Sequence, residues 1–252
     1  MVLVEKIQIE PLPTKKPRRL YVYLPRDYEQ SERRYPVLYM FDGHNVFFNS
    51  HATYGKSWGM KQYLDRTKCP LIVVAVGCNT EGFRRLSEYS PWDFHAPKPY
   101  GDVQGIGKVT MDWFTKTLKP QIDATFRTLP DREHTMIAGS SMGGLMTLYA
   151  MTAYNAVFSR GAALSACYWI NPKDREALIK THPLRQPTRL YLSIGTDEKP
   201  GGTRPLCAMF ETAKLLSRAG AEVAADVIPG ARHNEAEWEK RIPIFLPYLM
   251  QE

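Results

Sequence analysis

The chain has 252 residues, of which 44% are hydrophobic and 12% aromatic, so it can bury one sizeable core. Its 17 glycines, 19 prolines and 4 cysteines are too few for a disordered, collagen-like or disulfide-scaffold protein, and the length fits a single domain over residues 1–252. The formal net charge of +7 is densest at Lys15, Lys16, Arg18 and Arg19 but is otherwise mixed with acids, which favours a solvated basic surface over nucleic-acid binding.

The first predicted elements are two short runs, Val4–Ile9 and Arg19–Leu24, in which apolar and polar residues alternate. A connection rich in proline and lysine joins them, so they predict an antiparallel hairpin at one edge of a sheet.

From about Tyr35 onward, short apolar runs alternate with segments of helical periodicity. The predicted strands are Val37–Phe41, Leu71–Val76, Thr135–Ala138, Gly161–Leu164, Leu190–Ile194 and Val223–Ile228. The predicted helices are Trp58–Leu64, Val109–Phe126, Gly143–Tyr154, Asp174–Lys180, Leu206–Ala219 and Glu235–Met250. This alternation predicts an α/β fold with a mostly parallel sheet, because parallel strands buried on both faces read as unbroken apolar runs.

One stretch, Gly77–Gly107, shows neither pattern and is rich in proline, tyrosine, tryptophan and charge. It leaves the end of the Leu71–Val76 strand, at the edge where open α/β sheets place their ligands. A long loop without regular structure in a compact domain is usually functional. Residues 78–106 are therefore predicted to form a substrate-side loop insertion, with a plain surface excursion as the alternative.

The motif that carries chemistry is G-x-S-x-G, present as Gly139-Ser140-Ser141-Met142-Gly143. A strand before it and an amphipathic helix after it are the context of a nucleophile elbow, a sharp turn that exposes the serine hydroxyl. A glycine-rich turn of this kind can also cradle a phosphate, but the sequence lacks G-x-x-x-x-G-K-[ST]. The pattern therefore favours Ser141 as a nucleophile.

A serine nucleophile needs a histidine base and a carboxylate that orients it, in the chain order serine, acid, histidine. Only His182 and His233 follow Ser141. His182 precedes a predicted strand, whereas His233 follows the last one and so lies at the same sheet edge as Ser141. Two adjacent carboxylates, Asp197 and Glu198, follow the preceding strand, and the residue types alone leave both open as the acid.

Together these segments resemble the putative-esterase family of α/β-hydrolases, which includes esterase D-like enzymes, feruloyl, acetyl-xylan and siderophore esterases, and mycolyltransferases. The matching segments follow the family order along nearly all of the chain after Tyr35. They are Tyr35–Phe47, Glu88–Trp92, Gly139–Gly144, Gly195–Glu198 and His233–Trp238.

The resemblance implies an α/β-hydrolase fold and a serine esterase that works through an acyl-enzyme intermediate without a metal or cofactor. It makes Ser141 the nucleophile and His233 the base, and it favours Glu198 over Asp197 as the acid. The backbone N–H groups of Met142 and His44 are then expected to form the oxyanion hole. Acyl transfer to an acceptor other than water, and a catalytically silent binding protein, are the alternatives.

Aromatic and basic residues crowd the loops expected near the site. They are His51, Tyr54, Trp58, Phe83, Arg84, Arg85, Tyr89, Trp92, Phe94, His95 and Tyr100. Trp58, Arg85, Tyr89 and Trp92 are candidate substrate contacts, because aromatic faces suit a phenolic or sugar group and arginine suits a carboxylate or phosphate. Packing of Tyr89 and Trp92 against the body is the alternative. The expected substrates are small acyl, phenolic or sugar esters, with the oligomeric state left open.

Targeting and metal signals are weak in this sequence. Its cysteines, Cys69, Cys78, Cys167 and Cys207, form no C-x-x-C pair and share no zinc spacing with histidine, so no metal site is expected. The N-terminal segment lacks the apolar run of a signal peptide, and the best apolar run in the chain is far shorter than the ~18 residues of a membrane span. These features predict a cytoplasmic protein without membrane contact.

Overall fold

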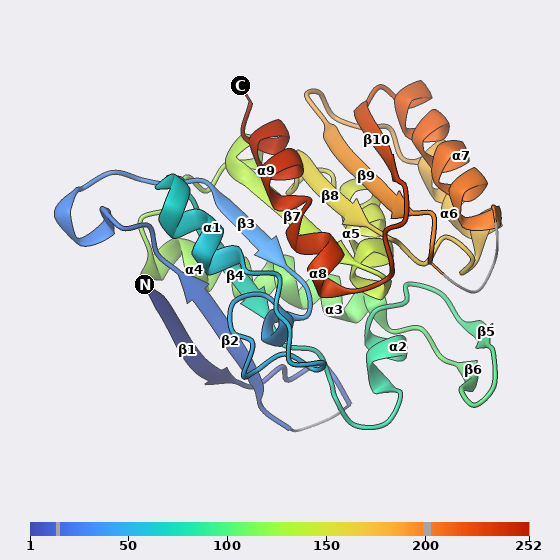
Figure 1. Ribbon diagram of the computed structural model, residues 1–252, viewed down its shortest axis with the longest axis horizontal. Helices are drawn as coiled ribbons and strands as arrows, with labels where there is room; N and C mark the ends of the chain where they lie inside the picture. Colours follow the sequence, from blue (N-terminus) through green and yellow to red (C-terminus); the bar gives the residue numbers. More distant parts are fainter. Residues whose placement is uncertain (14–15, 199–202, 252) are drawn as a thin grey trace.

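The computed structural model describes residues 1–13, 16–198 and 203–251, so Lys15 of the basic cluster lies outside the described residues. Its core is an eight-stranded sheet with helices on both faces, and the predicted α/β-hydrolase fold is confirmed (Figure 1). From edge to edge the strands are β1 (Val2–Ile7), β2 (Arg18–Tyr23), β4 (Ile72–Val76), β3 (Val37–Met40), β7 (Thr135–Ser140), β8 (Arg160–Leu164), β9 (Arg189–Gly195) and β10 (Glu222–Ile228).

The N-terminal hairpin is present at the sheet edge, as predicted. β1 pairs antiparallel with β2, and β2 pairs antiparallel with β4. The neighbouring pairs from β4 to β10 are all parallel. Every residue of β4 and β7 is buried, because helices cover both faces of the sheet. The parallel strands therefore end at one common edge, where the motif residues gather.

The two faces of the sheet carry separate hydrophobic cores. One core is covered by α3 (Gly107–Trp113), a π-helical turn (Phe114–Leu118), α4 (Lys119–Thr125), α5 (Met142–Ala153), α6 (Pro172–Thr181) and α7 (Arg204–Arg218). The other is covered by α1 (Met60–Thr67), α8 (Glu235–Glu239) and α9 (Ile242–Met250), which cross the front of the sheet in Figure 1. No helix in the described part of the chain has the length and apolar character to span a bilayer.

Two long predicted helices are divided in the structure. Val109–Phe126 contains the π-helical turn between α3 and α4, and Glu235–Met250 separates into α8 and α9. Proline occupies the first turn of α4 and of α9, a position that suits it because the backbone N–H is not needed there. Apolar periodicity continues through such a break, so the sequence pattern alone does not reveal it.

The segment after β4 contains short elements that the sequence pattern did not predict. They are α2 (Arg84–Glu88) and a small hairpin of β5 (Phe94–Ala96) and β6 (Gly101–Val103). Glu88 at the end of α2 forms a 2.6 Å ion pair with Arg18 of β2, and both side chains are buried. This contact ties the segment to the sheet edge, and elements of three to five residues are too short to give a periodic signal.

Candidate active site

The turn between β7 and α5 has the geometry of a nucleophile elbow. Ser141 has a φ of 57° and a ψ of −120°, a backbone conformation that costs free energy in a residue other than glycine. A Cβ atom on Gly139 would lie 2.7 Å from the backbone of Gly143, so only glycine fits there. The turn therefore holds Ser141 at the carboxyl end of β7 and starts α5 immediately afterwards.

Ser141 and His233 line the same cleft, which has a volume of about 510 Å³. The Ser141 hydroxyl lies 3.6 Å from the Cys167 thiol, and it has no hydrogen bond to His233 among the described residues. Burial raises the pKa of Cys167, so this thiol stays protonated and can act only as a weak hydrogen-bond partner.

His233 is held by Glu198. Its Nδ1 atom lies 2.9 Å from Glu198 Oε2, and the Glu198 side chain is only 10% exposed. The backbone N–H of Gly195 donates to Glu198 Oε1 at 2.8 Å. The neighbouring Asp197 is exposed, so of the two candidate acids the structure brings Glu198 to the imidazole.

Ser165 and Trp238 complete the support of this carboxylate, and the sequence analysis did not identify either residue. The indole N–H of Trp238 donates to Ser165 Oγ at 2.9 Å, and that hydroxyl donates to Glu198 Oε1 at 2.5 Å. The Trp238 ring also stands edge-on to His233, with centroids 5.2 Å apart. A chain of hydrogen bonds thus runs from the indole through the hydroxyl to the carboxylate and imidazole.

The two residues expected to supply the oxyanion hole lie at the same end of the sheet. Met142 is the first residue of α5, so its N–H is one of those that lack a partner within the helix. His44 lies in a 3₁₀ turn after β3 and lines the cleft with Ser141. A Cβ atom on Gly43 would lie 2.6 Å from the Ala75 backbone, so glycine lets this turn rest directly on β4.

An ion pair between the buried Asp42 and the partly exposed Arg85 supports the turn that carries His44. Asp42 accepts hydrogen bonds from Arg85 Nε and Nη2, each at 2.7 Å, and its N–H donates to the Tyr89 hydroxyl at 3.2 Å. Burial on its own would raise the pKa of Asp42, but the charge and hydrogen bonds of Arg85 outweigh it and hold that pKa below its usual range. Asp42 is therefore ionised at neutral pH.

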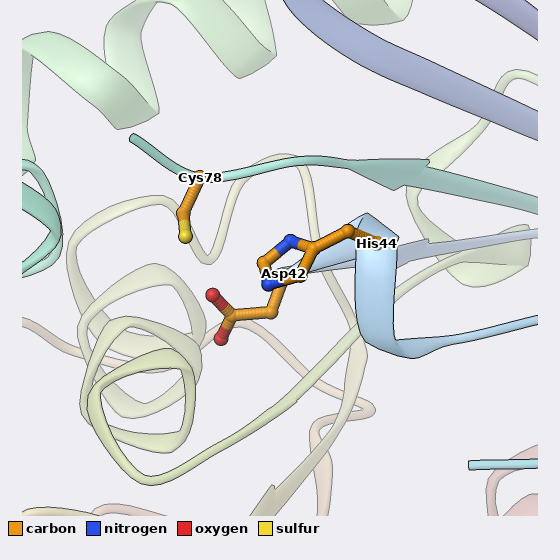
Figure 2. A group of neighbouring side chains, drawn as sticks. All are labelled: Asp42, His44 and Cys78. Atoms are coloured by element: carbon orange, nitrogen blue, oxygen red, sulfur yellow. The ribbon is translucent and has the colours of Figure 1, made fainter. Parts of the chain in front are cut away.

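Asp42, His44 and Cys78 are grouped as metal ligands often are, with donor atoms within 4.8 Å of one another. Figure 2 shows them converging from the ends of β3 and β4. Burial and the charge of Asp42 raise the pKa of Cys78 well above the usual thiol range, and a protonated thiol is a poor ligand. Because Arg85 already occupies the Asp42 carboxylate, the donor set does not fit a metal ion.

Of the four predicted substrate contacts, Arg85 lines the cleft. Trp58 is 3% exposed and packs between Trp238 and Phe245, and Tyr89 is 2% exposed. Trp92 packs edge-on against the ring of Tyr149 on α5. These places favour packing roles, so we do not retain the three aromatic residues as proposed substrate contacts.

The cleft wall also holds two aromatic residues of the predicted site-side loops, and an acid that the sequence analysis did not single out. Phe83 and Tyr100 are exposed, line the cleft and pack edge-on, with ring centroids 4.4 Å apart. Glu235 is a buried acid in the cleft wall that accepts a hydrogen bond from Asn45 at 3.1 Å. Burial raises the pKa of Glu235. In the sequence, only the position of Glu235 two residues after His233 indicated that this acid lies near the site.

The fold and the elbow define an α/β-hydrolase. The sequence matches the family described as "Putative esterase" over residues 13–249, and the chain belongs to that family. This family membership confirms the predicted enzyme class, a serine esterase.

Several known proteins resemble the chain. "Uncharacterized protein YbbA" of Bacillus subtilis is 26% identical over 72% of this chain and 69% of its own. "Endo-1,4-beta-xylanase/feruloyl esterase" of Xylanibacter ruminicola is 25% identical over 87% of this chain, which spans only 27% of that larger protein. The crystal structure of an IroE-like serine hydrolase from Shewanella oneidensis has a TM-score of 0.77 at 22% identity, covering 94% of this chain and 77% of its own; this likeness shows the shared fold.

We expect Ser165→Ala to lower kcat for p-nitrophenyl acetate about tenfold with little change in KM, since it removes one hydrogen bond worth about 1.5 kcal/mol to a charged group. Ser159→Ala is the matched control: that serine is buried, and its hydroxyl has no hydrogen-bond partner in the described part of the chain. Equal losses in the two variants would contradict a positioning role for Ser165.

We expect Asp42→Asn to destabilise the protein at pH 7 by about 3 kcal/mol, because it leaves the Arg85 guanidinium without its buried counter-charge. The folded pKa of Asp42 lies below the unfolded one, so the stabilisation is present above the unfolded pKa and is lost as pH falls through the folded value. The difference in unfolding temperature between Asp42→Asn and wild type should therefore shrink as the pH is lowered from neutral to acidic. Asp27→Asn, at an exposed site, is the control, and a gap independent of pH would refute the assignment.

Proposed function

We propose that the protein is a carboxylic-ester hydrolase in which Ser141 is the nucleophile, His233 the base and Glu198 the acid. The observation that supports this best is the 2.9 Å contact of His233 with an almost buried Glu198, beside the cleft that Ser141 and His233 both line. The family match supports the reaction class. The chain order serine, acid, histidine agrees with this fold.

The first half of the proposed reaction forms an acyl-enzyme. The Ser141 hydroxyl turns from Cys167 toward His233, which accepts its proton through Nε2 while Oγ attacks the ester carbonyl. Glu198 accepts a hydrogen bond from Nδ1 of the same ring, so the free Nε2 faces the proton to be removed. The N–H groups of Met142 and His44 stabilise the negative oxygen, and the protonated imidazole then gives its proton to the leaving alcohol.

The second half releases the acid. His233 removes a proton from a water molecule as that water attacks the acyl carbonyl, and the same N–H groups stabilise the second oxyanion. When the intermediate collapses, the ester bond to Ser141 Oγ breaks and the imidazole returns the proton to it. In the proposed reaction the His233 imidazole carries every proton transfer and the backbone N–H groups stabilise the developing negative charge, so the steps need no cofactor.

The proposed substrates are esters with small acyl, phenolic or sugar groups. Phe83 and Tyr100 offer exposed aromatic faces on the cleft wall, which suits a phenolic ring. The volume of about 510 Å³ suits a small molecule. The similarity to a protein named as a feruloyl esterase points the same way.

We expect Ser141→Ala to fold normally and to lose p-nitrophenyl acetate turnover by about three orders of magnitude or more, as loss of a triad nucleophile does. Ser140→Ala is the matched control, because it removes the adjacent hydroxyl of the same motif. Its turnover should stay within about tenfold of wild type. Wild-type turnover in Ser141→Ala, with circular dichroism unchanged, would defeat the assignment.

The two adjacent acids give a second test. Glu198→Gln keeps the size of the side chain but removes the charge that orients His233, so kcat should fall by about 10³ or more. Asp197→Asn removes an exposed charge and should change kcat by less than about threefold. Steady-state kinetics on both variants decides the question, and a harmless Glu198→Gln would return the role to Asp197.

A further inference from the structure

A second cavity of about 480 Å³ adjoins the catalytic cleft. His44, Thr53 and the segment Cys78–Thr80 line both cavities, so the two share a wall. Lys16, Arg18, Arg19 and His51 line the rest of its polar wall, and we call this cavity the basic groove. None of the described residues that line the groove is acidic.

The cations of the groove differ in whether their charge is already compensated. Arg18 forms its buried ion pair with Glu88 at 2.6 Å, so its charge serves the attachment of α2. Lys16 pairs with the exposed Glu81 at 3.0 Å, a solvent-screened contact of little energy. In the described part of the chain, Arg19 has no ion pair and no side-chain hydrogen bond, so its guanidinium is available to a ligand.

The strand pattern explains why two consecutive arginines have different roles. Successive residues of β2 point to opposite faces, so Arg18 is buried while Arg19 lies on the face of Tyr21. The Arg19 carbonyl accepts a hydrogen bond from Gly77 at 2.9 Å, which fixes Arg19 at the carboxyl end of β4. Tyr21, on the same face, places its hydroxyl 3.2 Å from His51 Nδ1.

The two histidines of the groove add neutral hydrogen-bonding groups. Burial lowers the pKa of His51, and the charge of Arg19 lowers it further. Burial also lowers the pKa of His44, and the charges of Arg85 and Arg19 act in the same direction against the opposing charge of Asp42. His44 contacts Thr53 through Nε2 at 3.0 Å. The groove thus combines one available guanidinium with neutral imidazoles and no acid among its described residues.

We propose that the basic groove binds a carboxylate carried by the substrate, so that the preferred esters are those of carboxylate-bearing molecules. This rests on the proposed function, because it names the substrate class of the same cleft. A guanidinium presents paired N–H donors that match the two oxygens of a carboxylate. Arg85 is less suited to bind the substrate carboxylate, because two of its nitrogens already donate to Asp42.

The test compares esters that differ only in a carboxylate and its neutral amide. One pair, 4-acetoxybenzoate and 4-acetoxybenzamide, carries the group on the alcohol side. The other, monomethyl adipate and methyl 5-carbamoylpentanoate, carries it on the acyl side. In at least one pair, wild type should prefer the carboxylate by about tenfold in kcat/KM, the scale of a charge-assisted hydrogen bond. The pair that shows the preference reveals the side of the ester that enters the groove.

Arg19→Gln should reduce that ratio about tenfold, since it removes the available guanidinium. Arg218→Gln removes another exposed arginine, at the end of α7 and not in the groove lining, and should leave the ratio unchanged. About 0.5 M NaCl should reduce the preference in wild type, because salt screens exposed charges. Equal kcat/KM for carboxylate and amide in both pairs, with all four esters hydrolysed, would overturn the groove proposal and leave the esterase proposal intact.

Binding gives a readout that does not depend on turnover. In Ser141→Ala, 4-acetoxybenzoate should raise the unfolding temperature more than 4-acetoxybenzamide does, and adding Arg19→Gln should abolish the difference. If wild type hydrolyses none of the esters, the proposed function fails while this thermal shift still decides whether the groove binds a carboxylate. Equal shifts for the two compounds would refute such binding.

Discussion

The Glu198 carboxylate is the group on which the arrangement of the cleft depends. One of its oxygens accepts hydrogen bonds from the Gly195 backbone and the Ser165 hydroxyl, and the other lies 2.9 Å from His233. These partners lie at or just after the ends of three parallel strands, so the geometry exists only when β8, β9 and β10 end at one edge. The carboxylate can then orient an imidazole that is itself 38% exposed.

A second carboxylate, that of the buried Asp42, supports the part of the cleft lining that includes His44. Asp42 has a φ of 54° and starts the turn that carries His44, and Arg85 holds it from α2. The segment after β4 therefore has two roles: it supplies the guanidinium that keeps this turn in place, and it presents Phe83 and Tyr100 to the cleft. Its attachment to β2 through Arg18 and Glu88 makes the sheet edge part of the same support.

The sequence predicted the fold and the principal motif well, because their signals are local. Unbroken apolar runs marked the parallel strands to within a residue or two, and the G-x-S-x-G context placed Ser141 on the elbow. Residue types alone could not decide between Asp197 and Glu198, because both are acids that follow β9 and they differ in the direction of their side chains. Ser165 was missed because a serine after a strand carries no distinguishing pattern until Trp238 and Glu198 meet it in space.

The substrate contacts were the weakest part of that prediction for a related reason. Residue type shows that an aromatic ring or a guanidinium can bind a ligand, but the fold decides whether it is already engaged. Trp58 and Tyr89 are engaged by packing, as Arg85 is by Asp42. The same reasoning separates Arg18 from Arg19: neighbours of identical chemistry lie on opposite faces of β2, and the strand's alternation commits one to the core and leaves the other for a ligand. On the groove proposal, recognition of a substrate would depend less on the net charge of the protein than on which cations have no ion pair in the described part of the chain.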